Sequence, residues 1–191
     1  MRAFIAIKLA PQIKEKLGVI QKRLIPCLPK LDWVKPDNLH LSLKFLGEIS
    51  LPQAQDLEQM IAQIVKTASP FQITLKTLGV FPDYRRARII WIGTDQAPPE
   101  LKQLTIQLEN KCLKLGIPQE VHPFQAHITL GRIKTKINPA VLEETLKGLT
   151  NEITGMDLRL DFKGITLFQS VLAPGGATYS ILKEELLPAS V

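Results

Sequence analysis

The sequence predicts an α+β fold made of two similar halves. Runs rich in β-branched and aromatic residues alternate with amphipathic segments, and their order is not a regular βαβ series. A strand that carries a histidine motif and is followed by a helix occurs once in each half. We therefore expect two lobes that face each other, with residues 1–191 forming a single domain.

In the first half, turn residues and apolar spacing separate strands from helices. Phe4–Leu9 is rich in strand-forming residues, and the following segment, 11–24, predicts a helix because it opens with proline and repeats apolar residues on one face. A short strand over Leu31–Val34 is expected to lead through a turn to a strand over Leu39–Leu46. Helical apolar spacing predicts the next helix over Leu51–Thr67.

The second half repeats this alternation with different lengths. Phe71–Val80 and Ala87–Thr94 predict strands joined by a basic segment, and Pro99–Leu115 predicts a helix that ends at Gly116. The remaining expected elements are a strand over Ala126–Ile133, a helix over Pro139–Lys147, and mostly strand at 157–172 and 177–184.

Composition points to an ordinary globular protein of the cytoplasm. Hydrophobic residues make up 45% and charged residues 22% of the chain, and no apolar window is long enough for a membrane span. Arg2 and Lys8 place charge where a signal peptide needs an apolar stretch. The two cysteines, Cys27 and Cys112, exclude a disulfide framework and a cysteine-based zinc site.

The charge balance is mildly basic. Lys and Arg number 24 against 18 Asp and Glu, which gives a net charge of +6. A positive excess raises the local concentration of polyanionic ligands. Many basic proteins bind no nucleic acid, so the charge favours such a ligand only weakly.

Two of the three histidines begin the same four-residue pattern. His40 and His127 are each followed by an apolar residue, a hydroxyl residue and a second apolar residue, as His-Leu-Ser-Leu and His-Ile-Thr-Leu. Two such matches would arise by chance in roughly one sequence in a thousand of this composition. His122 lacks the pattern and is expected to lie in a loop or on the surface.

The spacing of the pattern assigns its residues to faces of a strand. Alternate side chains of a strand share a face, so His40 and Ser42 point one way and the intervening leucine points into the apolar layer. His127 and Thr129 repeat the arrangement. Two such strands that meet would form a cleft with two imidazoles and two hydroxyl groups.

This set of groups suits the cleavage of a phosphodiester. One neutral imidazole removes a proton from the attacking water, and a protonated imidazole donates to the departing oxygen. The hydroxyl groups hold the non-bridging phosphate oxygens as negative charge develops on them. Two other interpretations stay open at this point. Either histidine could be a hydrogen-bonded core residue, and both could bind a metal, although no obvious third ligand lies nearby in the sequence.

The histidine segments and their flanks resemble a known family. The segment 33–47, Trp-Val-Lys-Pro-Asp-Asn-Leu-His-Leu-Ser-Leu-Lys-Phe-Leu-Gly, closely resembles the first signature of the two-histidine (2H) phosphoesterase superfamily. Within it, the match is to the RNA 2′,3′-cyclic phosphodiesterases, also called 2′-5′ RNA ligases. The segment 127–132 resembles the second signature, and the stretches 79–93 and 167–179 contain further similar residues.

The resemblance implies a fold and a mechanism. The fold would be bilobal, with two antiparallel sheets and outer helices arranged by a pseudo-twofold axis around a central cleft. His40 would donate a proton to the departing 3′-oxygen, while His127 would accept one from water and leave an RNA 2′-phosphate. No metal or cofactor would take part, and the reverse reaction would join RNA ends through a 2′-5′ bond. The pattern itself is symmetric and does not distinguish donor from acceptor.

Other residues near the motifs carry weaker expectations. Ser42 stands where the family has threonine, and it keeps the hydroxyl donor. Strict alternation places Arg132 on the apolar face, but a bulge near Gly131 would return it to the cleft, where the resemblance implies a phosphate contact. Lys44 shares the face of the first motif and is expected to raise the local positive potential.

Three arginines, Arg85, Arg86 and Arg88, are expected at a hairpin tip. They would either form a solvated basic loop or grip the RNA backbone. The partner is expected to be RNA with a 2′,3′-cyclic phosphate end, bound by a monomer without a membrane or metal. A 2H enzyme with another cyclic or 2′-5′-linked nucleotide, and a non-catalytic RNA-binding module, are the alternatives.

Overall fold

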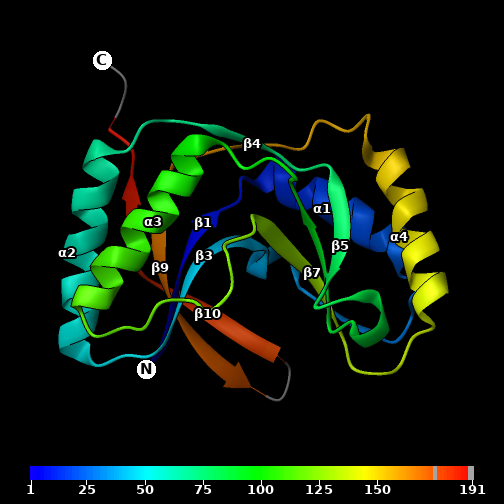
Figure 1. The fold of residues 1–191 in the computed structure, drawn as a ribbon, viewed down its shortest axis with the longest axis horizontal. Coiled ribbons are helices and arrows are strands. Elements are labelled where there is room, and N and C mark those ends of the chain that lie inside the picture. Colours follow the sequence, from blue (N-terminus) through cyan, green and yellow to red (C-terminus); the bar gives the residue numbers. More distant parts are fainter. Residues whose placement is uncertain (174–175, 189–191) are drawn as a thin grey trace.

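The computed structural model describes residues 1–173 and 176–188 and shows an α+β fold (Figure 1). The helices are α1 (Pro11–Leu24), α2 (Leu51–Thr67), α3 (Pro99–Lys114) and α4 (Pro139–Ile153), with short 3-10 helices η1 (Pro36–Asn38) and η2 (Tyr84–Arg86). The strands are β1 (Arg2–Lys8), β2 (Leu31–Trp33), β3 (His40–Glu48), β4 (Gln72–Thr74), β5 (Thr77–Phe81), β6 (Ile89–Gly93), β7 (His127–Ile133), β8 (Arg159–Asp161), β9 (Gly164–Ala173) and β10 (Gly176–Leu186).

Two antiparallel four-stranded halves meet at the two histidine strands. The first half has the order β10-β9-β1-β3, and in the second β7 pairs with β2 and β6, and β6 pairs with β5. A single residue pair, Leu41 with Ile128, joins β3 to β7 and makes one continuous sheet. β4 and β8 form a separate two-stranded sheet. The predicted α+β class and two-part antiparallel arrangement are confirmed.

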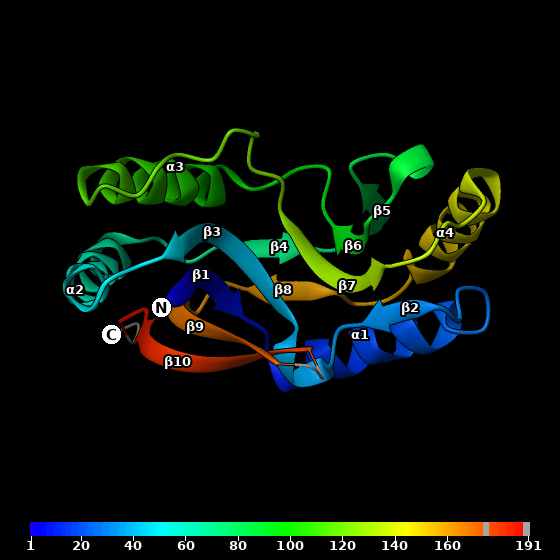
Figure 2. The ribbon, with the colours of Figure 1, turned by 90° about the horizontal axis from the view of Figure 1, so that it is seen from below.

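The helices α1 and α3 lie beside the half that does not contain the strand before them, whereas α2 and α4 lie beside the half that does. α2 and α3 lie beside the β1-β3-β9 half, while α1 and α4 lie beside the half that contains β5 and β7 (Figures 1 and 2). Gln21 on α1 donates to the Leu130 carbonyl of β7, and Lys44 on β3 reaches Glu109 on α3. Each histidine strand is therefore supported by a helix that follows a strand of the other half. Buried apolar side chains from both halves form one continuous core.

Two of the predicted boundaries were wrong. The strand expected over 71–80 is divided into β4 and β5, which belong to different sheets. The change of partner occurs at adjacent residues, because the Leu75 amide donates to Leu158 and the Lys76 amide donates to Gly93. The helix expected to end at residue 147 continues to Ile153, since Leu149 and Ile153 extend its buried face.

No helix among the described residues is both long and apolar enough to cross a membrane.

Candidate active site

The pairing of Leu41 with Ile128 brings the two histidine motifs together. Both side chains are fully buried on the core side of the sheet. Because neighbouring residues of a strand point to opposite faces, His40 and Ser42 lie on the other face of β3. His127 and Thr129 do the same on β7. The four predicted side chains thus surround one residue pair, which joins the two halves of the sheet.

Both imidazoles are oriented in the same way by their own chain. Nδ1 of His40 donates to the Asn38 carbonyl at 2.7 Å, and Nδ1 of His127 donates to the Gln125 carbonyl at 2.8 Å. A carbonyl oxygen only accepts, so the hydrogen is on Nδ1 in the neutral ring of each histidine. This leaves Nε2 of both rings free to accept or donate a proton.

A β-bulge in each histidine strand changes the face of the residues that follow the motif. On β7 the extra residue is Leu130, since Trp91 pairs with Thr129 and Ile90 with Gly131. Arg132 therefore returns to the cleft, as expected, although the extra residue is Leu130 and not the glycine. Gly131 instead lies under the Trp33 ring, where an added Cβ would come within 3.1 Å of it.

The matching bulge on β3 makes the expectation for Lys44 wrong. Here the extra residue is Leu43, because Ala6 pairs with Ser42 and Ile5 with Lys44. Lys44 is consequently turned to the core side, where it is 2% exposed. Its ammonium donates to Glu109 Oε2 at 2.9 Å and to the Pro118 carbonyl at 2.7 Å. Lys44 thus holds α3 against β3 and adds no charge to the lining of the cleft.

Gln21 supports the bulge on β7 from the core side. Its Nε2 donates to the carbonyls of Val34 at 2.8 Å and Leu130 at 2.9 Å, and the side chain is buried. The Val34 amide also donates to Leu130. The carbonyl of the bulged residue is therefore fully satisfied, which fixes the strand just before Arg132.

We expect the Gln21→Leu variant to be less stable than the wild type by about 1–3 kcal/mol, because the buried Leu130 carbonyl loses one of its two donors and the partly buried Val34 carbonyl loses its side-chain donor. Denaturant unfolding followed by circular dichroism measures this difference. Gln107→Leu is the matched control, since that glutamine is exposed on α3. An equal effect of both substitutions would show that the buried hydrogen bonds contribute nothing specific.

Aromatic rings lie around both imidazoles. The local sequence patterns did not predict this arrangement. The His40 ring lies 4.7 Å from Phe4 and 5.3 Å from Tyr179 between ring centres. The His127 ring lies 4.8 Å from Phe81. Burial lowers the pKa of His40 to about 4 and also lowers that of His127, while the backbone acceptors offset part of the effect. Both rings are therefore neutral at pH 7 in the free protein.

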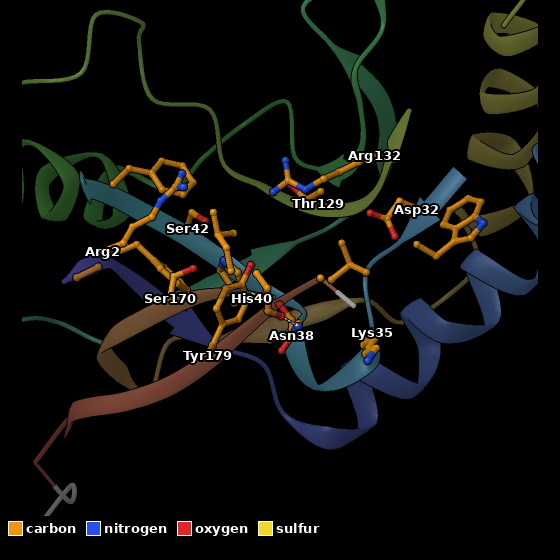
Figure 3. A pocket seen from close by; sticks show the side chains of 18 of the residues that line it. Arg2, Asp32, Lys35, Asn38, His40, Ser42, Thr129, Arg132, Ser170 and Tyr179 are labelled. Carbon is orange, nitrogen blue, oxygen red and sulfur yellow. Dashed lines mark hydrogen bonds between the residues drawn. The ribbon is translucent and has the colours of Figure 1, made fainter. Parts of the chain in front are cut away.

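A cavity of about 540 Å³ opens beside the motifs. Its lining includes His40, Ser42, Thr129 and Arg132, so four of the five predicted residues meet there. In Figure 3, His40 and Ser42 of β3 lie across this cavity from Thr129 and Arg132 of β7. His127 is not part of the lining, but its ring is close enough to His40 to affect the pKa of His40 by charge repulsion, as does Arg132.

The residues that the structure describes gather no cluster of metal ligands, and the three loop arginines lie apart from this site. Within residues 1–173 and 176–188, no group of three or more His, Cys, Asp or Glu gathers as metal ligands would. Arg85 and Arg86 lie in η2 and Arg88 directly before β6, outside the cavity lining. Nη2 of Arg86 donates a hydrogen bond to Oδ2 of Asp83 at 3.0 Å. An RNA contact by these arginines remains a prediction.

Two adjoining strands that each present an imidazole and a hydroxyl group beside a cavity are the arrangement of a phosphoesterase of the two-histidine class. The LigT like Phosphoesterase family model matches residues 7–91 and again residues 92–179, so the chain belongs to this family. This confirms the resemblance found in the sequence. Each of the two matches contains one of the histidine motifs.

Individual relatives agree with the assignment. The chain is 34% identical over 183 residues to an RNA 2′,3′-cyclic phosphodiesterase of Archaeoglobus fulgidus, covering 96% of this chain and 98% of the relative. The crystal structure of TT0787 of Thermus thermophilus superimposes with a TM-score of 0.81 at 25% identity, covering 98% of each chain. Escherichia coli LigT in complex with 3′-AMP does so with a TM-score of 0.77 at 30% identity, covering 97% of each.

Proposed function

We propose that this protein hydrolyses RNA 2′,3′-cyclic phosphate ends to 2′-phosphomonoesters by two-histidine acid–base catalysis. One observation carries the proposal. Two imidazoles with free Nε2 atoms and two hydroxyl residues surround the single pair that joins β3 to β7. The names of the relatives, which are RNA 2′,3′-cyclic phosphodiesterases, support this choice of substrate.

In the proposed mechanism the two histidines act on opposite sides of the phosphorus atom. His127 Nε2 takes a proton from water, whose oxygen forms a new bond to phosphorus. The bond from phosphorus to the 3′-oxygen breaks, and His40 Nε2 donates the proton that this oxygen needs. The donor and acceptor roles follow the resemblance of segments 33–47 and 127–132 to the two family signatures.

The remaining polar residues hold the phosphate. Ser42 and Thr129 donate their hydroxyl hydrogens to the non-bridging oxygens, and Arg132 offers a planar pair of N–H donors. The negative phosphate also favours a charged imidazole next to it. Binding of substrate therefore raises the pKa of His40 from its low value and supplies the protonated donor when it is needed.

We also propose the finer properties that the chemistry favours. The reaction needs no metal, because the two imidazoles supply both proton transfers and Arg132 supplies positive charge. A 5′-hydroxyl group of RNA that attacks in place of water would open the same cyclic phosphate, expel the 3′-oxygen and form a 2′-5′ bond, which is the ligation that the resemblance implies. We propose a single bilobal domain that acts as a monomer. A place in the cytoplasm agrees with the unpaired thiols of Cys27 and Cys112.

A direct assay tests the function. An oligoribonucleotide that ends in a 2′,3′-cyclic phosphate is incubated with the protein and excess EDTA, and the product is compared with synthetic 2′- and 3′-phosphate standards. We expect an undiminished rate and a 2′-phosphate. Strong inhibition by EDTA would contradict the metal-free mechanism, and a 3′-phosphate would reverse the assignment of the leaving oxygen.

The same assay separates the two alternatives. Faster hydrolysis of a 2′-5′-linked oligonucleotide, or of a small cyclic nucleotide without an RNA chain, would identify a 2H enzyme with a different substrate. Binding of the oligoribonucleotide without turnover of any of these compounds would identify a non-catalytic module.

A further inference from the structure

The outer part of the β9–β10 hairpin extends beyond the rest of its sheet. β9 pairs with β1 through residues 166–169, and the described residues of β9 after Gln169 pair with β10 alone. β10 is itself the edge strand of the sheet. Because a two-stranded hairpin by itself is marginally stable in water, side-chain contacts are needed to hold this part of the hairpin in place.

Asn38 supplies such a contact from the segment that precedes His40. Its side-chain Nδ2 donates to the Ala177 carbonyl of β10 at 2.8 Å. Its own carbonyl accepts the hydrogen of His40 Nδ1 at 2.7 Å. Asn38 is the last residue of η1, which is tied to α1 because the Lys14 ammonium donates to the Asp37 carbonyl at 3.1 Å. One well-held residue therefore joins the hairpin to the imidazole ring.

Tyr179 shows what this connection does for His40. Ala177 and Tyr179 are alternate residues of β10, and both line the cavity. The Tyr179 ring stands edge-on to the His40 ring, with the ring centres 5.3 Å apart, and it also lies 5.0 Å from the ring centre of Phe4. Figure 3 shows Asn38, His40 and Tyr179 together beside the cavity. The bond from Asn38 to Ala177 thus keeps the Tyr179 ring against the imidazole and contributes to its burial.

The equivalent residue before His127 is placed differently. Gln125 lies two positions before His127, and its carbonyl accepts from His127 Nδ1 as that of Asn38 does from His40. The Gln125 side chain is exposed, whereas the Asn38 side chain is partly buried against the hairpin. The backbone acceptors of the two rings are therefore alike, and the difference lies in the side chains of the residues that provide them.

We propose that Asn38 is a positioning residue for the proton donor, which connects the outer β9–β10 hairpin to His40. Its side chain holds the hairpin at Ala177, so that Tyr179 packs on the imidazole, and its carbonyl sets the direction of the ring. The role of His40 as donor rests on the proposed function. Because a donor must direct Nε2 at the departing oxygen, a small displacement of the ring lowers the rate. Loss of the Asn38 side chain should therefore affect His40 and leave His127 unchanged.

Nuclear magnetic resonance of the histidine rings tests the connection without substrate. The chain has three histidines, so their ring signals can be assigned from single substitutions. We compare Asn38→Ala with Asn38→Leu, which has a similar size but no donor. In both, the fraction of His40 with its hydrogen on Nδ1 should fall, and the pKa of His40 should rise from about 4 because water reaches the ring. The charged groups that act on this ring, Lys14, His127 and Arg132, are left in place.

Two further measurements examine the hairpin and the reaction separately. Amide hydrogen exchange of residues 176–180 should be faster in both Asn38 variants, because the hairpin has lost a contact that holds it. Their kcat for a 2′,3′-cyclic phosphate should fall about 10- to 100-fold with KM nearly unchanged, since the phosphate contacts remain. Gln72→Ala is the matched control, because it removes an amide donor that bonds Asp161 at 2.7 Å, outside the cavity lining.

Different results would overturn different parts of the inference. Unchanged His40 signals, an unchanged kcat, or equal changes at His40 and His127 would overturn the positioning role, the last because it would indicate a general loosening of the cleft. Unchanged exchange at residues 176–180 would overturn the anchoring of the hairpin by Asn38. Failure of the wild type to hydrolyse any 2′,3′-cyclic phosphate would overturn the proposed function, while the ring signals would still decide whether Asn38 orients His40.

Discussion

His40→Ala and His127→Ala should each lower kcat for a 2′,3′-cyclic phosphate by roughly 10²–10⁴, the usual contribution of one general acid or base. Each substitution removes a free Nε2 atom that the backbone acceptor orients toward the reacting groups. Single-turnover rates with saturating substrate measure the effect on the chemical step. Substrate binding should change less, since the hydroxyl residues and Arg132 still hold the phosphate.

The pH dependence of the two variants separates their roles. A donor must be protonated, so the wild-type rate falls as pH rises through the pKa of the donor in the substrate complex. An acceptor must be neutral, so the rate falls as pH drops through its pKa. His40→Ala should lose the alkaline fall and His127→Ala the acidic one. His122→Ala is the matched control, because His122 is exposed and outside both motifs. Full activity in either motif variant would remove the acid–base assignment.

Arg132→Ala should lower kcat/KM by roughly 10²–10³, comparable to the loss of one donor that stabilises a developing oxyanion. The bulge at Leu130 brings this guanidinium to the cavity shared by His40 and Ser42, where it is the fixed positive charge of the second histidine strand. Steady-state kinetics on a cyclic mononucleotide measures the effect without contributions from a longer RNA. Arg132→Lys should recover only part of it, because an ammonium lacks the planar pair of donors.

A control variant distinguishes the loss of the Arg132 contact with the phosphate from the loss of one positive charge. Arg23→Ala removes the same charge from an exposed position on α1, where Arg23 pairs with Glu152 at 3.0 Å. We expect that variant to retain nearly full activity. An equal loss in the two variants would mean that Arg132 acts through the overall field and not by holding the phosphate.

The histidine motifs were predictable because strand periodicity is a local property. Alternation alone assigns the two histidines and two hydroxyl residues to one face, and the structure places them there. Lys44 and Phe45 were not predictable in this way. A bulge inserts one residue and reverses the alternation after it, and its position depends on pairing with β1, which is far away in the sequence. The aromatic rings around His40 come from β1, β9 and β10, so no local pattern indicates them either.

The amino-acid sequence by itself determined which residue types are available for chemistry, most of the helices and strands, and the face on which each motif lies. These follow from side-chain chemistry and from the periods of helix and strand. Only the tertiary structure decided that Leu41 pairs with Ile128, that Lys44 turns inward and that Phe45 and Arg132 turn into the cavity. Such features depend on packing and hydrogen bonds between segments dozens of residues apart. Local sequence patterns do not specify that geometry.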